Sequence, residues 1–357
     1  MWGRTEATRR FKAIEIGLLL MAAGAWCPDL AAQSIPGDAA IARQFSRAFA
    51  GDISVQRRLG LALEHGYGVQ QNFSQAAYWL GKAAGLGDPY AQTELGTMYL
   101  EGSGVERDAA KAAEWFQRAA LSNYAVAEHN LGTLYYQGSG VNRDVDEALR
   151  WFRKAADRGL PQSEVNVGIL ALSGIGGGDR DAVRWLRKAA RHPYPRAWFA
   201  LGYAYEMGRG VPQDFRKAAE LYAKAADQNV PAANTNLGLL YETGKGVPLD
   251  LRRAKQHFLR AADGGDPFAY VSLARLSFQF ARTESEFAET YFWLRVAEMA
   301  LIPSNSLFPA VQANVRAVGS KLSQEARSAA EQRAKEWIAA HPATAVAGSM
   351  VVDIARN

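Results

Sequence analysis

Cysteine is almost absent from this chain. Cys27 is the only cysteine among 357 residues, and it lies in a segment that we expect to be removed on export. A chain without thiols can form no disulfide and can use no cysteine as a nucleophile. The composition therefore excludes a disulfide-stapled scaffold and thiol catalysis in the mature protein.

Strong charge and recognisable catalytic motifs are also missing. The net charge of +5 is too small to indicate binding to nucleic acid or to an anionic membrane. The five histidines have no second histidine or carboxylate at metal-ligand spacing, so we predict no metal and no cofactor. Ser-x-x-Lys, Gly-x-Ser-x-Gly and Gly-Lys-Ser/Thr do not occur, and neighbouring carboxylates such as Asp179 and Asp181 suit helix starts. We predict that the protein is not an enzyme and has no catalytic residues.

The N-terminus has the pattern of an export signal. An apolar run at 13–26 follows a basic stretch and is too short for a membrane-spanning helix, which needs about 20 residues. We predict a signal peptide at 1–32 with cleavage before Gln33, a periplasmic or secreted mature protein, and no membrane insertion after cleavage. Two alternatives use the same segment: a lipoprotein anchored at Cys27, which Trp26 disfavours, and a twin-arginine signal. The basic residues are Arg4, Arg9, Arg10 and Lys12.

What the sequence does contain is a long internal repeat. A Leu-Gly type pair recurs every 36 residues, with one interval of 34, over more than 200 residues. A period held so closely indicates a stack of similar structural units. The glycines are Gly60, Gly96, Gly132, Gly168, Gly202 and Gly238, and Ala274 takes the seventh place.

Each unit predicts two helices joined by a glycine loop. In 91–101 the apolar residues recur at spacings of three and four, which is typical of an amphipathic helix A. A Gly-x-Gly-Val loop ends it, as at 102–105, and an N-cap former such as Asp108 starts helix B. Small alanines in helix B allow close helix packing, and we expect a large aromatic to fill the gap beside them. That aromatic column contains Trp79, Trp115, Trp151 and Trp293, with Trp185 displaced by two residues.

A single helical hairpin cannot bury both of its faces, so neighbouring hairpins must stack on one another. We therefore predict an all-α, right-handed solenoid of about seven helical-hairpin repeats. The glycine loop of the fourth repeat, at 174–178, is shorter than the others. It is either a hinge or simply a tolerated deletion. The predicted parts are an N-terminal capping helix at 33–54, repeats at 55–90, 91–126, 127–162, 163–196, 197–232, 233–268 and 269–304, C-terminal capping helices at 305–340, and a flexible tail at 341–357.

The repeat motif resembles the Sel-one-like repeat (SLR), a relative of the tetratricopeptide repeat with a longer hairpin loop. Its pattern is A-x-x-x-L-G-x-x-Y-x-x-G-x-G-V-x-x-D-x-x-K-A-x-x-W-x-x-x-A-A, and the match covers residues 55 to about 304. The resemblance implies the solenoid fold and a protein-binding function. The missing cysteines separate this chain from the secreted, disulfide-stapled branch of the family, so the activity of that branch is not carried over.

In such a stack helix A lines the concave wall, where we expect a partner to bind. Asn130, Asn166 and Asn236 stand just before the Leu-Gly pair or its Val-Gly counterpart. By resemblance to tetratricopeptide relatives, these amides bond the backbone or carboxylate of a bound peptide. Alternatively, they belong to the fold and bond a neighbouring helix. The other candidates are His129, Thr133, Tyr136, Phe199 and Tyr203, with Glu206 and Met207 beside them, and core packing is an equal alternative for Phe199 and Tyr203.

We predict a non-enzymatic protein-protein interaction scaffold or regulator of the bacterial cell envelope. Its partner is expected to be an envelope protein or an extended peptide segment. The resemblance permits a sensor-kinase ectodomain or a component of polysaccharide or secretion machinery. The alternatives are a protein that binds peptidoglycan or exopolysaccharide and a hydrolase of the cell envelope. The sequence leaves open the partner, the pathway, the oligomeric state and the face that binds.

Overall fold

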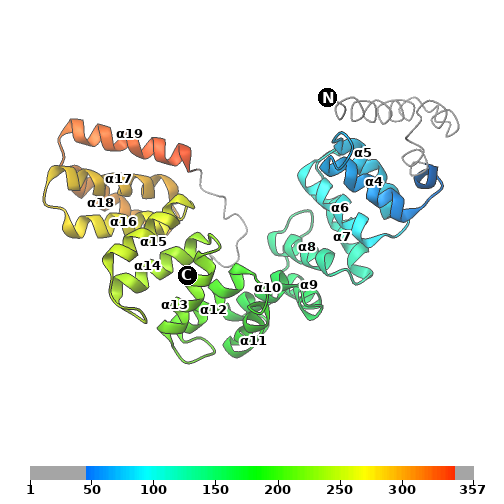
Figure 1. Cartoon of the computed structure of the whole chain (residues 1–357), viewed down its shortest axis with the longest axis horizontal. Helices are drawn as coiled ribbons and strands as arrows, with labels where there is room; N and C mark the ends of the chain where they lie inside the picture. The colour runs from blue at the N-terminus through cyan, green and yellow to red at the C-terminus, as the bar shows by residue number, and fades with distance from the viewer. Residues whose placement is uncertain (1–45, 342–357) are drawn as a thin grey trace, which may run out of the picture. The chain divides into compact units, whose positions relative to one another are not determined.

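The computed structural model describes residues 46–341. The predicted signal peptide, most of the predicted N-terminal cap and residues 342–357 of the predicted tail lie outside this range. The described chain is entirely α-helical and contains no β-strand (Figure 1), which confirms the predicted all-α repeat fold. It divides between Leu160 and Pro161 into two compact units, here called unit 1 and unit 2.

The helices alternate as helix A and helix B of successive hairpins. Unit 1 contains α4 (Ile53–His65) with α5 (Phe73–Gly85), α6 (Pro89–Glu101) with α7 (Ala109–Leu121), and α8 (Ala125–Gln137) with α9 (Val145–Asp157). Unit 2 contains α10 (Pro161–Leu172) with α11 (Asp179–Ala189), α12 (Pro195–Met207) with α13 (Phe215–Ala226), α14 (Pro231–Thr243) with α15 (Leu251–Asp263), and α16 (Pro267–Phe280) with α17 (Glu284–Ala300), followed by α18 (Phe308–Gly319) and α19 (Gln324–Ala340).

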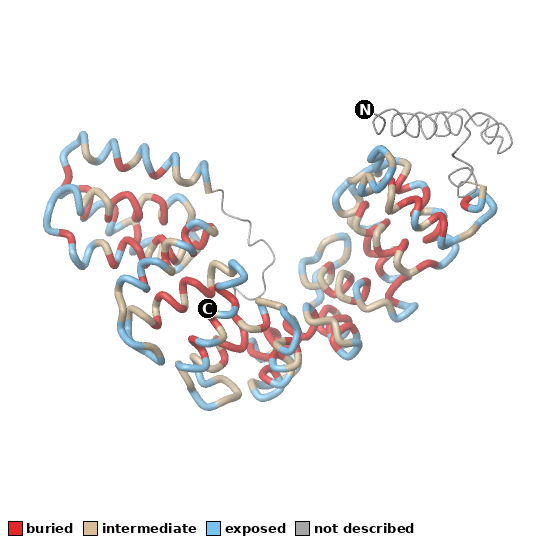
Figure 2. The backbone as a smooth tube through the Cα atoms, viewed as in Figure 1, coloured by how far each residue is buried: buried red, intermediate tan, exposed pale blue. Residues whose placement is uncertain are grey.

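The core of each hairpin forms where helix B lies against the helix-A glycine. A Cβ atom on Gly96 would lie 2.7 Å from Phe116, which is closer than packed atoms approach, so no residue larger than glycine fits without a shift. The residue that fills the gap is thus the one after the predicted tryptophan column. It is buried in every hairpin, as Figure 2 shows for the inner sides of the helices. The column consists of Leu80, Phe116, Phe152, Leu186, Tyr222, Phe258 and Leu294.

The tryptophans themselves have a more varied environment than we predicted. Trp79, Trp151 and Trp293 are buried, whereas Trp115 and Trp185 are only half-buried. Cationic side chains lie over the two half-buried rings: the Arg118 guanidinium is 4.5 Å from the ring centre of Trp115, and the Lys188 ammonium is 5.1 Å from that of Trp185. These aromatics sit at the margin of the core because the next residue already occupies its centre.

The loop between helix A and helix B joins each repeat to the one before it. In the third hairpin, Gly138 ends α8 in the left-handed conformation, and Gly140 follows with φ of 70°. A Cβ atom on Gly140 would lie 2.1 Å from the backbone oxygen of Ala109, at the start of the preceding helix B. The second loop glycine therefore allows direct contact between the backbones of neighbouring repeats.

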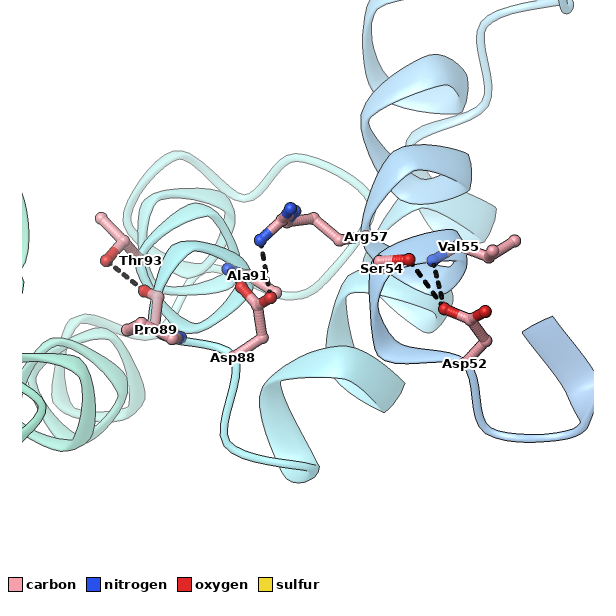
Figure 3. Close-up of polar contacts among 8 residues, drawn as sticks. All are labelled: Asp52, Ser54, Val55, Arg57, Asp88, Pro89, Ala91 and Thr93. Atoms are coloured by element: carbon pink, nitrogen blue, oxygen red, sulfur yellow. Dashed lines mark hydrogen bonds and ion pairs between the residues drawn. The ribbon is translucent and has the colours of Figure 1, made fainter. Parts of the chain in front are cut away.

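Aspartates at the helix-A starts add polar links between repeats (Figure 3). The Asp88 carboxylate accepts from the backbone nitrogen of Ala91 at 2.9 Å, which caps α6. Its other oxygen accepts from Arg57 Nη1 of α4 at 2.8 Å. Asp52 caps α4 in the same way, through Val55. The Asp88 carboxylate thus caps α6 and also binds α4, the helix A of the preceding repeat, through Arg57.

In the fourth repeat, the short loop is held by an arginine of the next repeat. Arg209 Nη2 donates to the backbone oxygen of Leu172, at the end of α10, at 2.6 Å. The same guanidinium contacts both oxygens of Asp179, the first residue of α11, at 3.1 and 2.5 Å. One side chain therefore ties the end of helix A to the start of helix B across the shortened loop.

The C-terminal end replaces the glycine loop with other contacts. α16 and α17 occupy the place of the predicted seventh repeat, and Thr283 with Glu286 forms a capping box at the start of α17. α18 and α19 pack on α17, and Tyr291 donates to Glu331 of α19 at 2.7 Å. His341, which we predicted to open a flexible tail, stacks on Trp337 with 4.0 Å between ring centres.

Candidate functional site

On each helix A, the side chains that do not enter the core lie along one side, and within each unit we call these sides together the helix-A face. Its members stand two residues before, one after and four after the helix-A glycine, and this spacing places them on one side of the helix. Most are half-buried, so they are held by packing and still reach solvent. They include Glu64, Glu94, Thr97, Asn130, Thr133, Tyr136, Asn166, Tyr203, Glu206, Asn236, Leu239 and Glu242.

In unit 2 a buried hydroxyl links three helices at this face. Tyr222 of α13 stands in the core column, where the neighbouring repeats have Phe or Leu, and its hydroxyl donates to Glu206 of α12 at 2.6 Å. The Asn236 side chain of α14 also hydrogen-bonds this hydroxyl. The Tyr222 ring lies 5.6 Å from the ring of Phe199. A core aromatic thereby fixes the position of a carboxylate on the face.

Burial raises the pKa of both ionisable groups in this network, Tyr222 and Glu206. Burial raises the pKa of the Tyr222 hydroxyl well above its ordinary value, and the Glu206 charge raises it further. Burial also raises the pKa of Glu206, against the opposing effects of the Tyr222 hydrogen bond and the Lys245 charge. The hydroxyl therefore remains a donor at neutral pH, and Glu206 is a partly desolvated acceptor.

In unit 1 the helix-A face carries carboxylates and tyrosines. Burial raises the pKa of Glu64, and the charge of Glu94 raises it further. Burial raises the pKa of Glu94 too, while a hydrogen bond from Tyr90 and the charge of His65 lower it. The Tyr90 and Tyr124 rings lie 6.2 Å apart. Among the described residues, Glu64 Oε2 is buried and has no hydrogen-bond partner.

Four of the predicted partner-binding residues lie on α8, in unit 1. His129, Asn130, Thr133 and Tyr136 are all half-buried. The His129 ring is 5.5 Å from Phe152, and the Thr133 hydroxyl donates to the His129 carbonyl at 3.1 Å. These contacts hold His129 and Thr133 in place on α8.

The other four predicted residues lie in unit 2. Asn166 of α10 is half-buried, as are Tyr203 and Asn236. Phe199 is only 2% exposed, so its ring belongs to the core and offers no surface to a partner. The contact of Asn236 with Tyr222 matches the alternative in which the asparagine bonds a neighbouring helix.

Sequence reasoning missed Tyr222, because it placed the aromatic column one residue earlier. The signal is visible when the residues twenty after each helix-A glycine are aligned: Phe116, Phe152 and Phe258 have no hydroxyl, and Tyr222 does. A lone hydroxyl in an otherwise apolar column needs a partner in the core. That requirement points to Glu206 on the adjacent helix A.

Neither a metal centre nor a membrane anchor is found among residues 46–341. No group of three or more His, Cys, Asp or Glu side chains there could hold a metal ion. None of the helices in this range is both long enough and apolar enough to cross a membrane. The helix-A face, with its mixture of carboxylates, amides and aromatics, is the candidate site that remains.

The repeats match the Sel1 repeat model at residues 53–88, 89–124, 125–160, 161–194, 195–230 and 231–266. These matches cover more than half of the chain, which therefore belongs to the Sel1 repeat family. Each match begins two residues before the corresponding repeat that we predicted from sequence. Proteins with this fold are generally non-catalytic binding scaffolds for protein partners.

Solved structures with the same fold include a Sel1 repeat protein from Oxalobacter formigenes. It is 30% identical to this chain, covers 70% of it and 98% of its own length, and has a TM-score of 0.63. A protective antigen of uropathogenic Escherichia coli strains with an SLR fold is 23% identical, with coverages of 86% and 87% and a TM-score of 0.46. An immunity protein from Pseudomonas aeruginosa is 22% identical, with coverages of 64% and 81% and a TM-score of 0.40. No functionally curated protein matches the chain.

Proposed function

We propose that this protein is a non-enzymatic scaffold or regulator of the bacterial cell envelope, which binds a partner protein through the helix-A face. The observation that carries the proposal is the set of half-buried polar and aromatic side chains that the helices A present within each unit. Such a surface is mixed in polarity and partly held by packing, which is typical of protein-binding sites. The family, whose members generally bind proteins, supports the same function.

Localisation in the periplasm is part of this proposal. It rests on the basic and apolar pattern of residues 1–32, which lie outside the described range. A periplasmic scaffold would meet envelope proteins or extended segments of them. Phe199 is left out of the proposed binding surface because it is buried.

Pull-down of a partner from envelope extract tests the proposal when it is combined with substitutions. The triple variant Asn130→Ala, Asn166→Ala, Asn236→Ala should bind the partner about 10- to 1,000-fold more weakly, since each hydrogen bond contributes roughly 0.5–1.5 kcal/mol. The matched control is Glu114→Ala, Arg150→Ala, Glu220→Ala, which alters three exposed helix-B positions. Circular dichroism should show unchanged helicity in both.

Lost helicity in the asparagine variant would instead show that the amides serve the fold. Unchanged binding with intact helicity, together with loss of binding in the helix-B variant, would move the interface to the other side of the hairpins. Saturable binding of purified peptidoglycan or exopolysaccharide with no protein partner would replace the proposal by the polysaccharide-binding alternative.

A further inference from the structure

Two glutamates at the same repeat position in unit 2 differ in their partners. Glu206 and Glu242 each stand four residues after the helix-A glycine, on α12 and α14. Glu242 accepts two hydrogen bonds from Arg275 of α16: Nη1 lies 2.8 Å from Oε1, and Nη2 lies 2.6 Å from Oε2. This is the paired geometry that a guanidinium and a carboxylate prefer. The next helix A can therefore supply a cation to this position.

Glu206 has no such arginine. The residue of α14 that corresponds to Arg275 is Leu239, which stands one place after the helix-A glycine. In the described chain no ion pair reaches Glu206, whose hydrogen-bond donor is the Tyr222 hydroxyl. The charge of Lys245 lowers the pKa of Glu206, but the Lys245 ammonium lies over the Phe215 ring, 5.2 Å from the ring centre.

Two carboxylates that this fold buries fully each have a cationic partner. The fully buried Glu128 pairs with Arg158 at 3.0 Å, and the fully buried Glu164 pairs with Lys188 at 2.9 Å. Loss of hydration is costly for a carboxylate unless an opposite charge or hydrogen bonds offset it. Glu206 is half-buried and has one hydroxyl donor, so it retains the capacity to bind a cation.

We propose that Glu206 receives the side chain of an arginine or lysine from an extended partner segment, in the place that Arg275 takes against Glu242. The flanking residues fit the apolar stem of such a side chain: Tyr203 lies one turn earlier on the same stripe, and Met207 is 53% exposed. The inference rests on the proposed function, and it adds that the partner is recognised through a basic residue.

A random dodecapeptide phage library, selected on the purified protein, supplies the probe. Enriched peptides should share an arginine or lysine at a fixed position. Fluorescence anisotropy of one synthetic peptide should show about 10- to 150-fold weaker binding to Glu206→Gln, because a hydrogen bond to a charged group is lost. The side-chain amide of this variant can still accept from Tyr222, so the variant should keep its helicity and melting temperature.

Leu239→Arg tests the same geometry from the opposite direction. An arginine there should pair with Glu206 as Arg275 pairs with Glu242, and so should block the peptide. Leu239→Gln, which changes size and polarity without adding charge, should bind the peptide nearly as well as the unmodified protein. Glu220→Gln, on the exposed side of α13, is the control for general charge and should leave binding unchanged.

The outcomes separate this inference from the proposed function. Peptides that bind the helix-A face without a basic residue, or that bind Glu206→Gln as tightly as the unmodified protein, would overturn the inference and leave the scaffold proposal in place. A basic peptide whose binding survives Leu239→Arg would also overturn it. If the library yields no peptide that binds, the inference fails, and the pull-down from envelope extract decides the scaffold proposal by itself.

Discussion

At the scale of single residues, the helix-A glycines are small because a side chain of helix B occupies the space beside them. For Gly96 that side chain is Phe116, and for Gly238 it is Phe258, at 2.7 and 2.5 Å from where a Cβ would lie. Glycine inside a helix normally costs about 1 kcal/mol relative to alanine. The fold accepts this cost at nearly every repeat because the close approach of the two helices depends on it.

Gly96→Ala is therefore expected to destabilise the protein by about 1–3 kcal/mol, because overpacking at Phe116 outweighs the gain in helix propensity. Gly85→Ala is the matched control: Gly85 is the last residue of α5, and a Cβ there would meet nothing within 4 Å. It should stabilise by up to about 1 kcal/mol. Urea denaturation measures both. Equal effects of the two substitutions would contradict the packing role.

Glu64 makes stability depend on pH. Burial and the charge of Glu94 raise its pKa above the ordinary 4.5, so the folded protein holds this proton more tightly than the unfolded chain does. The resulting destabilisation is absent below pH 4.5 and is fully present once the pH exceeds the folded pKa. Glu64→Gln should therefore be more stable than the unmodified protein at pH 7, and the difference should vanish at about pH 3, where the carboxyl is protonated in both states.

Urea midpoints at the two pH values check this prediction. Glu114→Gln, at an exposed position of α7, is the control and should shift the midpoint equally at both. If Glu64→Gln were more stable than the unmodified protein only in the more acidic buffer, burial would not raise the pKa of Glu64 and the prediction would be wrong.

At the scale of elements, the glycine loops determine how hairpins join. Gly68 and Gly140 have the same φ of 70°, so alanine is strained equally at both, by about 1–2 kcal/mol. Only Gly140 touches the preceding repeat, since a Cβ on Gly68 would meet nothing within 4 Å. Gly140→Ala should thus cost about 1–3 kcal/mol more than Gly68→Ala in chemical denaturation, from the clash with Ala109. Equal costs would show that the loop contact between repeats contributes nothing.

The elements themselves could be predicted from sequence because they depend on local patterns that recur along the chain. The period, the glycine loops and caps such as Asp108 are enough to locate helices A and B. The links between repeats could not be predicted in this way. At the place of Gln92, which donates to the Ala84 carbonyl at 3.0 Å, the next repeat has Glu128. A carboxylate cannot donate to a carbonyl, so Glu128 pairs instead with Arg158, in the loop after the next helix B.

The candidate site was predicted only in outline for the same reason. Helix periodicity indicated the face that carries Asn130, Tyr136 and Tyr203. It could not distinguish Phe199, which is buried, from its half-exposed neighbours. It also gave no reason to expect Tyr222 beside Glu206, because that contact joins two helices through the core.

At the scale of the whole molecule, export is the prediction with the largest consequence. The mature protein should begin at Gln33, because the apolar run at 13–26 ends shortly before the small residues Ala31 and Ala32. Intact mass spectrometry of the protein purified from periplasm should give the mass of residues 33–357. A mass that retains residues 1–32, or a lipid on Cys27, would contradict it.

The contacts of the glycine loops all run from a later hairpin to the one before it. Gly140 rests on Ala109, Gly210 on Asp179 and Gly246 on Phe215, so in each case the later hairpin docks on the earlier one. A hairpin that emerges from a ribosome or a translocation channel thus meets a docking surface synthesised before it. Docking through these glycine loops can proceed from the N-terminal end in step with delivery of the chain, whereas the short loop of the fourth repeat is tied down only when Arg209 of the next repeat arrives.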